Sequence, residues 1–364
     1  MKLLVVGSGG REHAVIRKLK ENKEIEKIYC APGNGGISAD AECVDIKATD
    51  KENMVKFAKE NAIDFCVVTP DDPLALGMVD VMEEAGIPCF GPKANAAIIE
   101  ASKAFSKDLM KKYGIPTADY ETFDNEKDAL HYIEEKNTFP IVIKADGLAL
   151  GKGVLICETL DDAKTALREM MVEHVFGLSG NKVVVEEFMT GKEVSVLAFT
   201  DGNVVKPMIS SMDHKRAYDN DEGLNTGGMG TIAPSPYYTK EIAETCMETI
   251  FLPTVKAMNA EGRTFKGCLY FGLMLTPKGP RVVEYNCRFG DPETQVVLPL
   301  LNSDLLTIMK ACHDGTLKDV DVVWSEEACA CVVEASGGYP VKYEKGFEIH
   351  GLDENGQHDG VIVY

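Results

Sequence analysis

Three polar side chains at two-residue spacing, Glu284, Asn286 and Arg288, form the most informative pattern of the sequence. The stretch from Arg281 to Asn286 is rich in β-forming residues and follows a turn cluster, which predicts a strand. Because side chains alternate between strand faces, Glu284 and Asn286 point the same way. Their oxygens suit Mg²⁺ or Mn²⁺, and a guanidinium suits a carboxylate or phosphate. The pattern favours phosphoryl-transfer chemistry, although taken alone it is also typical of a solvated strand face.

A glycine-rich turn, Gly7-Ser-Gly-Gly10, follows a short apolar strand (2–6) and precedes an expected helix (11–20). Such a turn presents backbone N–H groups at the positive end of a helix, where anions bind. A dinucleotide-binding fold is disfavoured because Glu12 stands where the third glycine of G-x-G-x-x-G would be. A plain tight turn remains the alternative.

Strands alternate with helices in the first hundred residues, which predicts an α/β fold that begins with a Rossmann-like parallel sheet. The further strands are expected at 25–31, 65–69 and 87–90. Ligands bind such sheets at the carboxyl ends of the strands. The loops 7–13, 32–36 and 69–74 should therefore converge there and form a pocket for a phosphorylated sugar.

The middle of the chain predicts a nucleotide site. A helix is expected over 94–113, with Lys103 near its centre, and a strand over 140–144 that ends in Lys144. The glycines between Gly147 and Gly153 precede a further strand (154–157), so a hairpin flap that covers phosphates is expected, with a plain surface hairpin as the alternative. This is not a Walker A loop, since a strand and not a helix follows it.

Two acidic residues end a strand expected over 181–188, and a further strand follows over 194–199. This strand end could bind an adenine edge and ribose hydroxyls, or form a solvated hairpin. Long irregular loops in compact domains are typically functional or disordered, and 213–230 is such a polar, glycine-rich segment. A helix is expected over 239–259, kinked or broken by Pro253.

The length, net charge and cysteine content of the chain narrow the classes of protein to which it can belong. A length of 364 residues predicts roughly two to four domains. The net charge of −20, from 38 basic and 58 acidic residues, argues against nucleic-acid and membrane-surface partners. The 11 cysteines contain no CxxC pair, which indicates buried reduced thiols and a cytoplasmic location.

Five motifs in order resemble the phosphoribosylamine–glycine ligase family, the glycinamide ribonucleotide synthetases of purine biosynthesis within the ATP-grasp superfamily. The motifs are Gly7-Ser-Gly-Gly-Arg-Glu-His13, Ala31-Pro-Gly-Asn-Gly-Gly36, Asp213-His-Lys-Arg216, Asn225-Thr-Gly-Gly-Met-Gly230 and Asn286-Cys-Arg-Phe-Gly-Asp-Pro-Glu-Thr-Gln295. The resemblance implies an ATP-dependent ligase that joins glycine to 5-phosphoribosylamine through glycyl phosphate. Other ATP-grasp carboxylate–amine ligases, and an inactive ATP-binding truncation product, are the alternatives.

The resemblance also implies a role for each matching residue. Catalysis would rest on Arg288 and Lys144, and the metal would lie on Glu284 and Asn286. ATP would be held by Lys103, Lys144, Gly151, Lys152, Gly153, Glu186, Glu187, Phe188 and Glu193. The substrates would be held by Gly9, Gly10, Arg11, Glu12, Asn34, Gly35, Gly36, Pro70, Asp71, Asp72, Asp213, His214, Lys215, Thr226, Gly227, Gly228 and Arg288.

The implied organisation has five parts: an N-terminal domain (1–100), an entry helix (101–120), a flap-bearing ATP-grasp subdomain (121–190), an ATP-grasp core (191–322) and a small β-rich C-terminal domain (323–364). We expect a monomer. The chain departs from the family at Phe271 and Gly272, where many ATP-grasp enzymes carry another acidic ligand, and at Pro70-Asp-Asp, where the family often has Pro-Glu. Family members also continue past Tyr364, so the C-terminal domain is expected to be incomplete.

Overall fold

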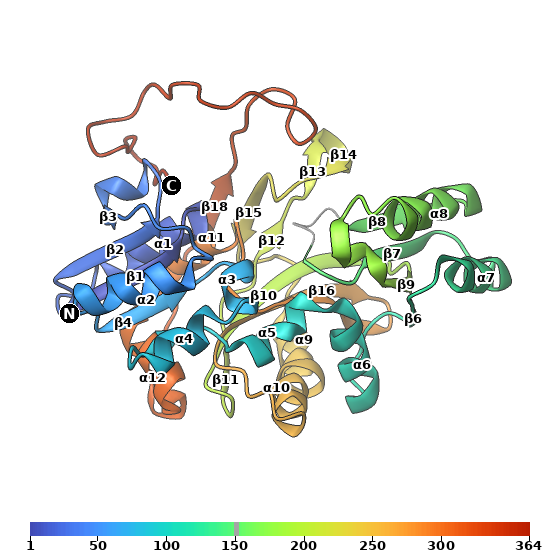
Figure 1. Cartoon of the computed structure of the whole chain (residues 1–364), viewed down its shortest axis with the longest axis horizontal. Helices are drawn as coiled ribbons and strands as arrows, with labels where there is room; N and C mark the ends of the chain where they lie inside the picture. Colours follow the sequence, from blue (N-terminus) through green and yellow to red (C-terminus); the bar gives the residue numbers. More distant parts are fainter. Residues whose placement is uncertain (149–152) are drawn as a thin grey trace.

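The structure is a computed structural model and describes residues 1–148 and 153–364. The first domain contains a parallel sheet of order β3-β2-β1-β4-β5 (Figure 1). Its strands are β1 (Lys2–Gly7), β2 (Lys27–Pro32), β3 (Glu42–Cys43), β4 (Phe65–Val68) and β5 (Cys89–Phe90). The parallel sheet predicted from the alternating pattern is confirmed.

Helices cover both faces of this sheet, which is why β1 is an uninterrupted apolar run. Leu3 and Val5 share one hydrophobic cluster with α1, whereas Leu4 and Val6 share another with α2 and α4. The helices are α1 (Gly10–Leu19), α2 (Lys51–Glu60), α3 (Asp71–Ala75) and α4 (Met78–Glu84).

Two antiparallel four-stranded sheets follow. The first, of order β6-β9-β7-β8, consists of β6 (Tyr120–Phe123), β7 (Ile141–Ala145), β8 (Val154–Cys157) and β9 (Val183–Glu187), covered by α7 (Glu126–Lys136) and α8 (Leu160–Leu167). The second, of order β11-β10-β16-β17, consists of β10 (Lys192–Thr200), β11 (Val205–Pro207), β16 (Gly267–Thr276) and β17 (Gly279–Asn286). Since β9 and β10 belong to different sheets, the solvated-hairpin interpretation of 181–199 is wrong.

The helix expected over 94–113 is two helices, α5 (Ala94–Ala101) and α6 (Lys103–Tyr113). Ser102 leaves the helical conformation, and its hydroxyl accepts a hydrogen bond from the Phe105 N–H. Asp146 also accepts the Ala104 N–H (2.7 Å). These caps satisfy free N–H groups at the start of α6, and they place Lys103 at the start of a helix and not at its centre.

The helix expected over 239–259 is also interrupted. A π-helical turn (Met247–Phe251) lies between α9 (Lys240–Cys246) and α10 (Leu252–Ala260), and Pro253, which has no N–H to donate to the preceding turn, follows it directly. The apolar sides of these helices pack against β10, β16 and β17.

A three-stranded sheet joins distant segments: β12 (Met212–Asp213), β15 (Gly230–Ala233) and β18 (Cys329–Val332). Between β12 and β15, β13 (Arg216–Tyr218) and β14 (Glu222–Asn225) form a hairpin where an irregular loop was expected. The helices α11 (Thr294–Val297) and α12 (Leu305–Asp314) follow β17. After β18 the chain passes over β13 and β14 and returns beside β3 (Figure 1). The rings of Tyr364 and His13 are in edge-to-face contact.

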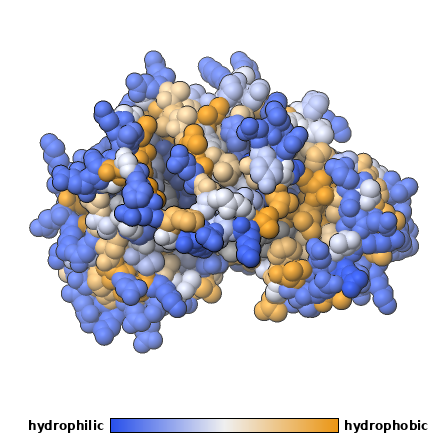
Figure 2. Space-filling view, turned by 90° about the horizontal axis from the view of Figure 1, so that it is seen from above, coloured by the Kyte–Doolittle hydropathy of each residue, from blue (hydrophilic) through white to orange (hydrophobic). Residues whose placement is uncertain are grey.

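Hydrophilic residues dominate both ends of the face shown in Figure 2, and hydrophobic residues gather between them, beside the end that carries α7 and α8. Among the described residues, no helix combines the length and the apolar character that a membrane span requires.

Candidate functional site

A β-bulge in β17 aims Glu284 and Asn286 at the site. Gly272 pairs with Glu284 while Leu273 pairs with Val282, so Val283 is the extra residue. The bulge lets Val282 and Tyr285 both face the core although they are three positions apart. Glu284 and Asn286 remain on the opposite face, which agrees with the shared face predicted from the alternation.

Arg288 is held by a buried carboxylate that sequence reasoning missed. Its Nη2 lies 2.8 Å from Oε1 of Glu100, whose Oε2 accepts the Cys287 N–H at 2.7 Å. Burial raises the pKa of Glu100, and Arg288 opposes this rise. Arg288 Nε is buried without a hydrogen-bond partner in the described part of the chain, so its N–H, which lies in the plane of the guanidinium, is available to an anion.

Two predicted lysines reach the same region from different elements. Lys144 at the end of β7 donates to the Val283 carbonyl oxygen (3.1 Å) and pairs with Glu186 Oε2 (3.1 Å). Lys103 donates to the Gly147 carbonyl oxygen (2.9 Å), and burial lowers its pKa. The predicted residues Gly151 and Lys152 lie outside the described residues.

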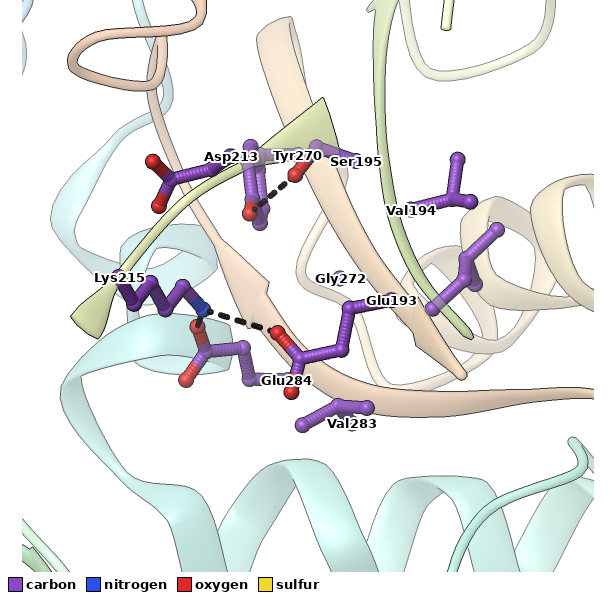
Figure 3. Close-up of a pocket in the computed structure, with 10 residues that line it drawn as sticks. Glu193, Val194, Ser195, Asp213, Lys215, Tyr270, Gly272, Val283 and Glu284 are labelled. Carbon is purple, nitrogen blue, oxygen red and sulfur yellow. Dashed lines mark hydrogen bonds and ion pairs between the residues drawn. The ribbon is translucent and has the colours of Figure 1, made fainter. Parts of the chain in front are cut away.

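Lys215 lies between the carboxylates of Glu193 and Glu284 (Figure 3), at 3.7 and 3.8 Å. Burial lowers the pKa of Lys215, but Glu284 and Glu193 outweigh it and hold the pKa well above its usual value. For Glu284 the effect of burial has the opposite sign, and it raises the pKa. The positive charges of Lys215, Lys144, Lys103 and Arg288 outweigh it and bring the pKa of Glu284 below its ordinary value. Four cationic side chains therefore surround the predicted metal ligand.

The metal-ligand oxygens at this site fit a cation that is bound together with phosphate. Glu284 and Asn286 are hard-oxygen donors on one strand face, and Asn286 Oδ1 lies 3.5 Å from Arg288 Nη2. No cluster of three or more acidic, His or Cys ligands occurs in the described ranges. Mg²⁺ usually takes one or two protein carboxylates and completes its shell with phosphates and water. Phosphate oxygens would supply the missing ligands and offset the surrounding positive charge.

Asp213 lines the same pocket, opposite Tyr270 and Ser195 (Figure 3). Burial and the nearby Glu293 raise the pKa of Asp213 to about 8. Its Oδ1 is buried and has no hydrogen-bond partner among the residues that the structure describes. Ser195 Oγ joins Tyr270 Oη (2.8 Å) to Glu293 Oε1 (3.2 Å). Asp213 is therefore a carboxyl group that holds a proton near neutral pH.

The three N-terminal loops converge as predicted. Glu12 accepts the Gly9 N–H (2.6 Å) and the Thr69 hydroxyl (2.6 Å), and it pairs with Arg11 Nε (2.7 Å). Asn34 Nδ2 donates to the Ser8 carbonyl oxygen (2.8 Å). Glu12 is fully buried and both its oxygens are used, so it joins two loops together and does not face the pocket.

The other predicted residues lie around these loops. Pro70 precedes α3, which begins at Asp71 and Asp72. Glu187 Oε1 pairs with Arg281 (2.6 Å), so this acid is already engaged. Gly35, Gly36, Phe188, His214, Thr226, Gly227 and Gly228 occupy loops or strand ends, with Phe188 and His214 exposed.

Gly228 has φ +119, and an added Cβ would lie 2.8 Å from Asp213 Oδ1. A side chain at this position would be strained and would crowd the free carboxyl oxygen. The Gly227 N–H donates to the Tyr339 hydroxyl (3.1 Å).

Three charged side chains beside the candidate site were not predicted from the sequence: Glu100, Lys107 and Glu293. All three are buried charged side chains. Lys107 and Lys103 are four residues apart on one helix, a spacing that would have placed them on a common face. No signal in the sequence pointed to Glu100 or Glu293, because their partners are far away in the chain.

Comparisons with known proteins cover most of the chain. Residues 1–100 match the family model "Phosphoribosylglycinamide synthetase, N domain", and residues 101–294 match its "ATP-grasp (A) domain". A phosphoribosylamine–glycine ligase of Caldanaerobacter subterraneus is 51% identical over 354 residues, which are 97% of this chain and 85% of the relative. One from Listeria innocua is 50% identical over all of this chain and 86% of its own length.

Solved structures agree with these matches. The phosphoribosylamine–glycine ligase of Thermotoga maritima superposes with a TM-score of 0.85 at 32% identity, over 97% of this chain and 85% of that one. N5-carboxyaminoimidazole ribonucleotide synthetase of Thermus thermophilus superposes with a TM-score of 0.65 at 16% identity, over 91% of this chain and 82% of that one. The second likeness concerns the fold alone.

Proposed function

Because the chain belongs to the phosphoribosylamine–glycine ligase family, we propose that it joins glycine to 5-phosphoribosylamine with ATP as the phosphoryl donor. The products are glycinamide ribonucleotide, ADP and phosphate, and the reaction belongs to purine biosynthesis. The protein is an ATP-using ligase, as its family is.

The chemistry has two steps. Glycine's carboxylate is too weak an electrophile to react with an amine, so one of its oxygens first attacks the γ-phosphorus of ATP, and ADP leaves. The amine of 5-phosphoribosylamine then attacks the carbonyl carbon of glycyl phosphate, loses a proton and expels phosphate. Such a reaction is accelerated by positioning the reactants and by neutralising developing negative charge.

The four cationic side chains around Glu284, which are Lys103, Lys144, Lys215 and Arg288, support the first step. Lys103 and Lys144 would hold the phosphates of ATP, and the strand end at Glu186 to Phe188, together with Glu193, would hold adenosine. Arg288 would hold the carboxylate of glycine, with the Nε–H that has no partner among the described residues as one donor. Glu284 and Asn286 would hold Mg²⁺ (or Mn²⁺), which supplies charge neutralisation at the phosphates when bound.

One contact carries the assignment of the second substrate. Arg11 Nη1 donates to the Phe289 carbonyl oxygen (3.0 Å), so the N-terminal glycine turn adjoins the residue that follows Arg288. A phosphorylated amine bound by the loops around Gly9, Asn34 and Asp71 would therefore lie beside the acyl phosphate. The loops at Asp213 to Lys215 and Thr226 to Gly228 would contact the same substrate.

The defining experiment measures ADP release with each substrate omitted in turn. ADP should form at an appreciable rate only when glycine and 5-phosphoribosylamine are both present. Turnover with another carboxylate and amine would favour a different ATP-grasp ligase. Nucleotide binding without any turnover would indicate an inactive ATP-binding protein.

The domain boundaries and the oligomeric state are also proposals. We propose a domain boundary at residue 100, which the boundary between the two family models supports, and the further parts 101–120, 121–190, 191–322 and 323–364. A cytoplasmic monomer is proposed, and gel filtration with light scattering tests the oligomeric state.

A further inference from the structure

Three charged side chains are buried together beside the proposed nucleotide site. Lys107 of α6, Glu186 of β9 and Lys144 of β7 are 2%, 3% and 5% exposed. Both ammonium groups meet the same carboxylate oxygen, Glu186 Oε2, at 3.0 and 3.1 Å. Two cations thus share one anion, and the group carries one excess positive charge.

The two lysines are held very differently. Lys107 Nζ also donates to the Thr117 hydroxyl (2.8 Å), and Thr117 in turn donates to the Val282 carbonyl oxygen (2.7 Å). Among the residues that the structure describes, Lys144 Nζ has one other acceptor, the Val283 carbonyl oxygen at the bulge, next to Glu284. Lys107 is therefore tied to residues away from the pocket, whereas the Val283 carbonyl that Lys144 contacts belongs to a residue that lines the pocket.

We propose that Lys107 is a positioning residue for the nucleotide: it remains the counter-ion of Glu186 and so allows Lys144 to exchange from Glu186 to the phosphates of ATP. This inference rests on the proposed function. A buried carboxylate without a partner is strongly unfavourable. If Lys107 were absent, Lys144 would be the only cation on Glu186, and its movement toward phosphate would leave that carboxylate unpaired.

A mutant cycle with nucleotide affinity as the readout tests the coupling. The variants are Lys107→Met, Glu186→Gln and the double variant, and calorimetry gives the Kd of a non-hydrolysable ATP analogue with Mg²⁺. Lys107→Met should weaken binding by about 10- to 100-fold in the native background, and by less than about threefold when residue 186 is Gln, because no buried anion then remains. Lys112→Met serves as a matched control, since Lys112 lies on the same helix in an exposed pair with Glu261.

Proton uptake provides a second readout that needs no variant. Burial lowers the pKa of Lys107 to about 8; Glu186 opposes this shift, while Lys144 and Arg281 add to it. The Thr117 hydroxyl, the Ala118 carbonyl oxygen (3.5 Å) and the ring of Tyr120 also lie against the Lys107 ammonium group. Departure of Lys144 removes one repelling cation, so the pKa of Lys107 rises. Nucleotide binding near pH 8 should then take up protons, detected as a heat that depends on the ionisation enthalpy of the buffer.

The outcomes separate the inference from the proposed function. If the native protein does not bind the analogue, the proposed function is wrong. If it binds, but Lys107→Met costs the same factor in both backgrounds or nothing at all, the positioning role is wrong. Should Lys107→Met fail to fold, Lys107→Gln replaces it, because an amide can still donate to Thr117. Absence of proton uptake in the native protein also overturns the inference.

Discussion

Arg11 and Phe289 are 278 positions apart, yet the guanidinium of Arg11 donates a 3.0 Å hydrogen bond to the carbonyl oxygen of Phe289. The same guanidinium pairs with Glu12, which caps the glycine turn. The contact joins the first loop of the chain to the segment that carries Arg288. It fixes the distance between the proposed sugar-phosphate pocket and the proposed phosphoryl-transfer site.

Replacing Arg11 should therefore affect one substrate more than another. We expect Arg11→Ala to raise the KM for 5-phosphoribosylamine by about 10- to 150-fold, the equivalent of one charge-assisted contact of roughly 1.5–3 kcal/mol. The KM for ATP should change much less. Steady-state kinetics with each substrate varied in turn gives the comparison, and an equal loss for ATP and 5-phosphoribosylamine would remove Arg11 from the sugar-phosphate site.

The shared face of Glu284 and Asn286 leads to a second prediction. Glu284→Ala should abolish ADP formation while unfolding stays cooperative, because a partly exposed polar group contributes little to stability. Rates are measured over a range of Mg²⁺ concentrations, with Glu248→Ala, an exposed acid on the π-helical turn, as the control. Recovery of a near-native rate at saturating Mg²⁺ would refute the metal assignment.

The sequence predicted those features that depend on local pattern. Alternation and apolar runs located β1, β2, β4 and β7 to β10, and they placed Glu284 and Asn286 on one face. The break at Ser102 was not predicted, because it depends on Asp146, which is 44 residues away from Ser102. The bulge at Val283 and the partners of Arg288 and Glu186 likewise arise from contacts between distant segments.

A third prediction concerns Gly147, whose carbonyl oxygen accepts a hydrogen bond from Lys103. A Cβ at residue 147 would overlap Ser179 Oγ and lie 3.1 Å from Ser179 Cα. Such overpacking typically costs about 1–3 kcal/mol. Since the Gly147 carbonyl oxygen accepts from Lys103, Gly147→Ala should lower both the melting temperature and the affinity for ATP.

A second-site change tests whether the overlap is the cause. Ser179→Gly removes the hydroxymethyl group that the new methyl group meets, so the double variant should recover part of both losses. Gly337→Ala is the control, because a Cβ there meets nothing within 4 Å. Equal losses in the single and double variants would show that the clash with the Ser179 side chain is not responsible.

The raised pKa of Asp213 predicts how stability depends on pH. In the unfolded chain this carboxyl group ionises near its ordinary value of 3.8, whereas in the folded protein burial and Glu293 raise the pKa to about 8. Between these values the folded state keeps a proton that the unfolded state has lost. The stabilising contribution of the protonated group is therefore complete below about pH 4 and declines as the pH rises, until it is lost above about pH 8.

Asp213→Asn cannot ionise and should escape this decline. Its melting temperature should match that of the native protein near pH 4 and exceed it at pH 8.5, by roughly 1 °C for each kcal/mol of relief. Thermal unfolding from pH 4 to 9 measures the difference, with the exposed Asp219→Asn as control. A constant difference across the range would mean that Asp213 ionises in the folded protein at its ordinary pKa. The rise in stability should also be smaller when Glu293 is replaced by Gln, because the repulsion between the two carboxylates is then already removed.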